Sequence, residues 1–236
     1  MVPGERLEAK FGGEVARLSF EGDTWCAFDR ANKLLAQAPV AVLANAAEAP
    51  GLAPSRAVRI RRVRGQLTFL PAERFVAPHV VVLRGGFVLP AIRGASVAGA
   101  SYDFDDADPS PRASSHQGNL ERLNRILPGA ASDIDPASLE GMVGFRAVAP
   151  DRLPLIGALA DETAQAPKNP QLASLARRHG LYGAFAYGSR GLLWAGLGAE
   201  LLASLIEGEP LPLEGPLADA LDPGRFLLRA LRRRGE

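Results

Sequence analysis

The chain has 236 residues, of which 47% are hydrophobic and 22% are charged, as in an ordinary globular protein with one large domain or two small ones. Its formal net charge of +1 excludes a general attraction to nucleic acid and leaves only local basic patches. A single cysteine excludes an internal disulfide and a cysteine-built metal site, and the histidines lie far apart. We therefore expect no metal.

Two segments could have indicated a membrane or export, and neither does. The first residues, MVPGERLEAKF, contain no apolar core of the kind that a signal peptide needs. The longest apolar run, around residues 191–206, is interrupted by Glu200 and favours a buried helix over a membrane span. We expect no membrane partner and a cytoplasmic location.

The first quarter of the chain predicts short strands. Residues 14–29 form a hairpin pattern around the turn Glu21-Gly22-Asp23. The stretch at 40–43 is continuously apolar, which predicts a strand at the centre of a parallel sheet covered on both faces. The basic run at 56–64 then leads into a strand at 67–70.

The middle of the chain predicts an antiparallel block. Strand-like pieces separated by tight turns occur at 79–83, 86–91 and 95–101, and another follows at 142–150. Between them, the acidic and proline-containing residues 103–114 predict an exposed loop. A helix is expected to begin at a Ser115 cap and to run to Leu127, where Pro128-Gly129 ends it.

The last third of the chain predicts alternating elements. We expect a short helix at 172–180, a strand at 180–188 and a long helix from about Arg190 to Ile206 that ends before Gly208. A basic helix or tail follows at 225–236. Because α/β features flank an antiparallel block, the expected fold class is α+β or α/β, with a central domain between pieces of another.

The start of the long helix is the first candidate site. Ser189 is a suitable N-cap, and Gly188 and Gly191 would let a ligand approach the backbone closely. Gly191, Ala195, Gly198 and Ala199 form a small-residue face, and spacing alone favours tight packing of the helix on a sheet. The alternative is that the free N–H groups face an anion or an electron-rich ring edge. The Gly196-Leu197-Gly198 sequence is not a dinucleotide fingerprint, because position 201 is leucine, and no other stretch matches one.

Arg146 is the second candidate. It stands in the run GFRAVAPDRLPLIG, residues 144–157, where LPLIG favours core packing. The arginine could pair with nearby Asp151. Alternatively, its planar guanidinium could bind a carboxylate in a bidentate manner.

Together these two stretches resemble the C-terminal half of D-amino-acid-oxidase-like flavoproteins. With VAVLANAA (40–47), VRGQLTFLP (63–71) and GGFVLPA (85–91), the chain resembles in detail the FAD-dependent oxidoreductase domain of the bifunctional enzymes that make 5-methylaminomethyl-2-thiouridine at the tRNA wobble position. The resemblance implies part of a glutathione-reductase-like FAD-binding domain at 1–50 and 150–236. It also implies an antiparallel substrate domain at 51–149.

The resemblance implies an oxidoreductase that uses FAD to act on a CH–NH group. The carboxymethylaminomethyl group of the wobble uridine would lose its carboxymethyl part, leaving aminomethyl, with tRNA as the substrate partner. Arg146 would bind the substrate carboxylate and Phe87 would lie near the substrate. The residues expected beside FAD are Gly188, Ser189, Arg190, Gly191 and Leu192 at the helix start, and Ala44 and Asn45 near the FAD-binding sheet.

The glycine fingerprint that binds the FAD pyrophosphate in these flavoproteins has no counterpart in this sequence. We therefore expect a truncated piece, or a partner that supplies the N-terminal segment or the methyltransferase domain, and we expect the isolated chain to bind little flavin. Two other functions stay open: an amine oxidase of the glycine, sarcosine or D-amino-acid type, and a tRNA-binding fragment without catalysis.

Overall fold

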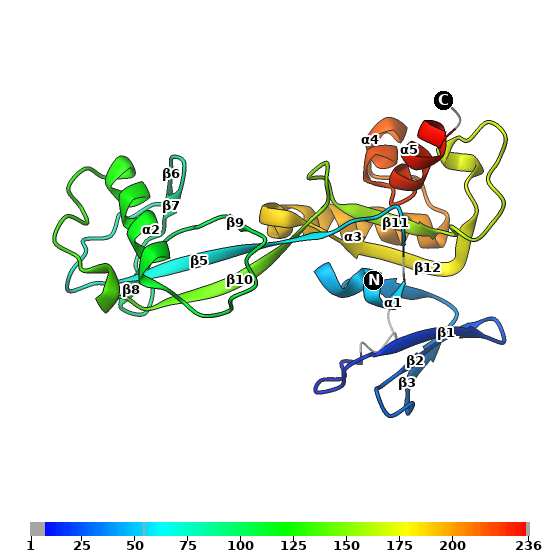
Figure 1. Ribbon diagram of the computed structural model, residues 1–236, viewed down its shortest axis with the longest axis horizontal. Coiled ribbons are helices and arrows are strands. Elements are labelled where there is room, and N and C mark those ends of the chain that lie inside the picture. The colour runs from blue at the N-terminus through cyan, green and yellow to red at the C-terminus, as the bar shows by residue number, and fades with distance from the viewer. Residues whose placement is uncertain (1–7, 54, 235–236) are drawn as a thin grey trace. The chain divides into compact units, whose positions relative to one another are not determined.

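The computed structural model describes residues 8–53 and 55–234, and it contains two compact units (Figure 1). Unit 1 consists of the described residues up to Ile60 together with those from Ala149 onward, and unit 2 is Arg61–Val148. The chain therefore leaves unit 1 once, builds unit 2 and returns. The assignment of these units as FAD-binding and substrate domains stays a prediction.

Unit 1 contains two sheets. Its strands are β1 (Arg17–Glu21), β2 (Thr24–Phe28), β3 (Leu34–Ala38), β4 (Ala41–Leu43), β11 (Leu155–Ala160) and β12 (Arg177–Phe185). The predicted hairpin is confirmed, since β1 and β2 pair antiparallel with Glu21 opposite Thr24. Strand β3 was not expected from the sequence; it pairs with β2 and completes the first sheet.

The second sheet has the order β11-β12-β4, in which β12 runs antiparallel to β11 and parallel to β4. The parallel pairing of the 40–43 stretch is as expected, but its central position is wrong. Among the described residues β4 pairs only with β12 and lies at a sheet edge, where Val42 is 41% exposed. Its apolar residues instead border a surface hollow, described below.

The predicted helix at 172–180 is also wrong. Only Leu172–Ser174 forms a helical turn, η3, and β12 begins at Arg177. In β12 the buried residues alternate with partly exposed ones, the two-residue period of a strand. Gly180 does not end a helix: it has a φ of +63°, and a Cβ there would collide with the carbonyl of Pro39.

The helical elements of unit 1 are η1 (Ala46–Glu48), α1 (Ala49–Leu52), η3, η4 (Gly188–Arg190), α3 (Gly191–Glu207), α4 (Gly215–Leu221) and α5 (Arg225–Arg234). The predicted long helix is confirmed as α3, which ends at Gly208 in the left-handed conformation. The expectation that it is buried is wrong, because most of its residues are exposed or partly exposed, with Leu193 79% exposed. It packs on β11 and β12 (Figure 1). Gly198 lies in this contact, whereas Ala195 and Ala199 are exposed, so the small residues do not form one packing face.

The core of unit 1 includes the end of the GFRAVAPDRLPLIG stretch. Leu155 and Ile156 are 0% and 1% exposed, which confirms that LPLIG serves core packing. Leu155 packs in a cluster with Leu43, Leu181 and Phe185, while Ile156 belongs to the cluster beneath α3.

Unit 2 is an antiparallel sheet with the order β10-β5-β8-β7-β6, and β9 also pairs with β5. Its strands are β5 (Arg61–Pro71), β6 (Val82–Leu83), β7 (Phe87–Val88), β8 (Ala95–Gly99), β9 (Asp103–Phe104) and β10 (Gly141–Val148). The antiparallel pairing of the middle block is therefore confirmed. The expected loop at 103–114 contains β9, which the acidic composition did not predict.

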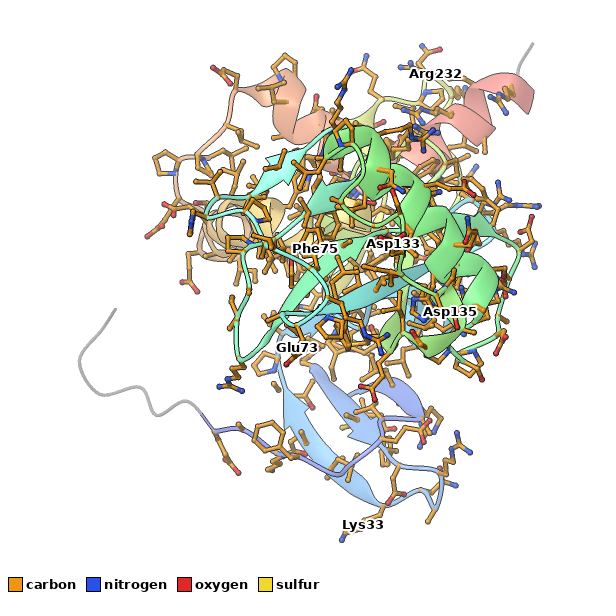
Figure 2. All side chains as sticks on the ribbon, turned by 90° about the vertical axis from the view of Figure 1, so that its left-hand side faces the viewer. Lys33, Glu73, Phe75, Asp133, Asp135 and Arg232 are labelled. Carbon is orange, nitrogen blue, oxygen red and sulfur yellow. The ribbon has the colours of Figure 1, made fainter. Side chains whose placement is uncertain are left out.

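Helix α2 (Ala113–Ile126) covers one face of this sheet. Its Leu120 and Leu123 pack against Leu70 of β5, and Phe75, labelled in Figure 2, belongs to the same core. The predicted Ser115 cap is wrong, because the helix begins two residues earlier, at Ala113. The Ser115 hydroxyl is buried and lies within hydrogen-bond distance of the guanidinium of Arg64. A further helical turn, η2 (Pro136–Ser138), precedes β10.

Candidate functional site

The register of the unit 2 sheet places both proposed substrate-contacting residues on one face. Leu70 packs against α2, so Val63 and Leu67, which differ from it by odd numbers of residues along β5, point to the other face. Arg146 is paired with Val63. Phe87 is paired with Gly99, which is paired with Leu67. Arg146 and Phe87 therefore share the face remote from α2.

The guanidinium of Arg146 lies over Gly65 of the neighbouring strand. A Cβ at Gly65 would be only 2.7 Å from Cζ of Arg146, so the arginine occupies space that any other residue would fill. Nη1 donates a hydrogen bond to the carbonyl of Ser101 at 3.3 Å, and Cζ lies 5.2 Å from the centre of the Tyr102 ring. The register between β5 and β10 brings Gly65 beside Arg146. No local pattern in the sequence predicted Gly65, Ser101 or Tyr102 as site residues.

Arg146 is a half-buried cation without a carboxylate within ion-pair distance among the described residues. Burial lowers the pKa of its guanidinium, while Tyr102 and Asp103 act in the opposite direction. Arginine nevertheless stays charged in proteins. A partly desolvated, unpaired guanidinium on a sheet face is suited to bind a carboxylate.

The alternative interpretation, in which Arg146 pairs with Asp151, is wrong. The carboxylate of Asp151 instead accepts hydrogen bonds from Arg225 at 2.9 and 3.0 Å and from Arg229 at 2.9 Å. Burial raises the pKa of Asp151, but these arginines outweigh burial and the pKa is lowered. The Asp151 carboxylate thus serves unit 1, and Arg146 is left for another partner.

Phe87 is partly buried and lies against glycine. A Cβ at Gly99 would approach Leu67 Cδ2 to 2.9 Å and Phe87 Cζ to 3.5 Å, so the absence of a side chain there makes room for both. The phenyl ring offers apolar contact and no hydrogen bond.

In unit 1, the residues expected beside FAD follow the carboxyl ends of two neighbouring strands. Leu43 of β4 is paired with Gly183 of β12, and the two strands are parallel, so their carboxyl ends meet. Ala44-Asn45 and the turn that starts at Gly188 follow these ends. The carboxyl edge of parallel strands is where α/β proteins bind ligands.

A hollow of about 760 Å³ lies beside β4. Ala44 and Asn45 line it together with residues of β1, β2 and α1, among them Leu18, Ala27 and Leu52. Both residues are exposed, and Asn45 makes no capping hydrogen bond to the turn that follows. Its amide is therefore available to a ligand.

The amino end of α3 carries uncapped N–H groups. Ser189 is not the N-cap, because the turn η4 intervenes and Arg190 occupies that position without a side-chain capping bond. The first turn holds no acidic residue, and Leu192 is 98% exposed. The partial positive charge of this helix end is thus available to an electron-rich group.

These residues fit one part of FAD. An uncapped helix end, next to the edge where β4 and β12 stop, suits the electron-rich edge of a flavin ring. The sequence contains no G-x-G-x-x-G turn for the pyrophosphate. The residues of this site therefore fit the flavin ring, whereas the sequence offers no glycine-rich turn for the pyrophosphate.

Two other kinds of site are not found in the parts of the chain that the structure describes. No group of three or more His, Cys, Asp or Glu side chains among residues 8–53 and 55–234 could hold a metal ion. None of the helices in these ranges is long and apolar enough to cross a membrane.

Comparison with known proteins defines the class. The fold resembles two solved enzymes, an oxidase and a dehydrogenase, at identities too low to show more than the fold. Glycine oxidase from Bacillus cereus ATCC 14579 matches with a TM-score of 0.63 and 18% identity, over 85% of this chain and 51% of that one. L-proline dehydrogenase from P. horikoshii matches with a TM-score of 0.65 and 18% identity, over 94% and 54%. The predicted fold class, α+β or α/β with an antiparallel block, is confirmed.

Residues 6–205 match the family described as DAO, FAD dependent oxidoreductase, and the chain belongs to that family. This confirms FAD as the cofactor of its class. The tRNA 5-methylaminomethyl-2-thiouridine biosynthesis bifunctional proteins MnmC of Burkholderia mallei (strain SAVP1) and Burkholderia pseudomallei (strain 668) are 50% identical to it over 97% of its length. The chain spans 36% of each of these relatives.

Proposed function

We propose that this chain supplies the oxidase part of an enzyme that removes the carboxymethyl group from 5-carboxymethylaminomethyl-(2-thio)uridine at the wobble position of tRNA. The observation that carries the proposal is the Arg146 guanidinium, half-buried on a sheet face and without a carboxylate partner in the described residues. A glycine-like substrate presents such a carboxylate. The names of the 50% identical relatives supply the tRNA substrate class.

Arg146 binds the substrate carboxylate through two parallel N–H groups, and this fixes the neighbouring CH₂ group in one orientation. Gly65 and the Ser101 carbonyl hold the guanidinium in place, and Phe87 provides an apolar wall on the same face. Because the amine nitrogen is attached to that CH₂ group, the Arg146–carboxylate pair also fixes the distance between the nitrogen and Arg146. These residues position the substrate, and no side-chain base is required when the amine is neutral.

Bound FAD would supply the two-electron oxidant, which would take a hydride from the carbon between the nitrogen and the carboxylate. The amine loses one N–H proton in the same oxidation, so the substrate becomes an imine. Water then adds to the imine carbon, and the C–N bond breaks to give glyoxylate and the aminomethyl nucleoside. In unit 1, the α3 end and the residues 188–192 and 44–45 would contact the flavin ring.

The experiment supplies FAD and tRNA bearing the carboxymethylaminomethyl group, and it measures glyoxylate release. Arg146→Ala is expected to abolish turnover, whereas unchanged turnover would contradict the carboxylate-binding role. Binding gives a readout that needs no flavin. The unchanged chain should bind an RNA loop with the carboxymethyl group more tightly than one with aminomethyl only, and Arg146→Ala should remove this preference.

Two other functions give different outcomes in the same assay. Glyoxylate release from free glycine or sarcosine, without release from tRNA, would indicate an amine oxidase of the D-amino-acid type. Salt-dependent tRNA binding with no release from any substrate would indicate a binding fragment.

A further inference from the structure

Two exposed aromatic rings continue from Arg146 along unit 2. Tyr102 and Phe104 are 40% and 47% exposed, and their ring centres lie 5.2 Å apart with planes inclined at 71°. Since Cζ of Arg146 lies 5.2 Å from the Tyr102 ring centre, the aromatic pair starts at the proposed carboxylate-binding residue.

A second arginine covers the other ring. Cζ of Arg61 lies 4.7 Å from the centre of the Phe104 ring, and its Nη2 donates to both carboxylate oxygens of Asp105, at 2.9 and 3.2 Å. The order along the surface is therefore Arg146, Tyr102, Phe104 and Arg61. Two cations flank two exposed rings.

The sheet holds these rings in place. Phe104 belongs to β9 and is paired with Val63, which is also paired with Arg146, so Phe104 lies on the face remote from α2. The fully buried Arg64 fixes the segment that follows, because it donates to the carbonyls of Asp108 at 2.8 Å and Ser110 at 2.6 Å. The exposed rings are thus presented by a constrained backbone.

We propose that Tyr102 and Phe104 form a stacking platform for an unpaired base of the tRNA anticodon loop, with Arg61 beside its phosphate. The proposal rests on the proposed function and specifies how the same face binds RNA. Proteins recognise unpaired RNA bases by stacking them on aromatic rings and on arginine planes, and they neutralise the adjacent phosphates with arginine. A platform adjoining Arg146 would accept a nucleotide whose modified base reaches the guanidinium.

The test uses the full chain and a fluorescein-labelled anticodon stem-loop RNA that carries 5-carboxymethylaminomethyluridine, with affinity measured by anisotropy. Phe104→Ala and Tyr102→Ala are each expected to weaken binding roughly five- to 100-fold. Phe104→Trp should retain binding, and Phe104→Leu should lose it although the apolar volume is kept. Phe145→Ala is the matched control: this phenylalanine is 37% exposed, but it is paired with Arg64 and so lies on the opposite face.

A second arm separates base stacking from general attraction. Abasic nucleotides introduced one at a time into the loop should reveal a position whose loss weakens binding by the unchanged chain but not by Phe104→Ala. Equal affinities of the unchanged chain, Tyr102→Ala and Phe104→Ala would overturn the platform and leave the proposed function standing. If the unchanged chain does not bind the stem-loop, the platform and the proposed tRNA substrate both fail.

Discussion

The guanidinium of Arg146 lies where a side chain at Gly65 would have to be. The two residues stand on adjacent strands, β10 and β5, and the absence of a Cβ at Gly65 lets the arginine lie against the backbone, within reach of the Ser101 carbonyl. This relationship makes Gly65 a positioning residue for the proposed carboxylate contact.

Gly65→Ala is expected to displace the guanidinium and to weaken carboxylate binding while the sheet stays folded. The loss of a charge-assisted contact predicts a KM for the modified tRNA that is roughly tenfold higher or more. The measurements are KM and the free energy of unfolding.

Gly144→Ala is the matched control, since Gly144 is paired with Gly65 and a Cβ there would meet no atom within 4 Å. Its KM should stay unchanged. A KM for Gly65→Ala equal to that of Gly144→Ala would show that the space over Gly65 does not matter.

Whether the sequence predicts a feature of this site depends on how many residues along the chain separate the groups that interact. The hairpin at 14–29 and helix α3 follow from local patterns, and both were predicted correctly. The contact between Arg146 and Gly65 depends on the register of strands that are far apart in the sequence, which no local pattern encodes. The resemblance identified Arg146, but not the residues that hold it.

The wrong predictions also have physical causes. The segment LASLARRHG has helix-forming residues, yet pairing of β12 with both β11 and β4 overrides this local preference. Ser115 and Ser189 are good caps by composition, but the N-caps are Arg112 and Arg190, and the Ser115 hydroxyl lies against Arg64 instead.

The two glycines inside α3 should respond to alanine in opposite ways. At Gly196 a Cβ would meet nothing within 4 Å, so Gly196→Ala should stabilise the helix by up to about 1 kcal/mol. At Gly198 it would approach Tyr187 Oη to 2.8 Å and Ile156 Cδ1 to 3.0 Å, so Gly198→Ala should destabilise unit 1 by about 1–3 kcal/mol. Urea unfolding of the two variants measures both effects, and equal shifts would refute the close packing of α3 on β11.

Acid should destabilise unit 2 through His116. This side chain is 2% exposed, its Nδ1 lies 2.9 Å from Thr68 Oγ1, and burial lowers its pKa. Below the ordinary histidine pKa of about 6.5, the unfolded chain binds a proton that the folded chain does not, so stability falls as the pH falls from that value.

The free energy of unfolding measured in urea at pH 7.5 and at pH 5.5 gives the size of this loss. His116→Gln should reduce the pH dependence, and His79→Gln, at an exposed site in the same unit, should leave it unchanged. An identical pH dependence in all three proteins would exclude His116 as its cause.

The Asp151 carboxylate should contribute more to stability through Arg225 than through Arg229. Arg225 is 5% exposed and is held at the base of α5, where Asp151 is its carboxylate partner among the described residues. Asp151→Asn would leave a buried cation without a countercharge, and it should cost about 3 kcal/mol of unfolding free energy. Arg229 has a half-exposed side chain, so Arg229→Ala should cost less than about 1 kcal/mol. Urea unfolding of both variants tests this order, and a larger loss for Arg229→Ala would mean that the exposed pair, and not the buried one, anchors α5.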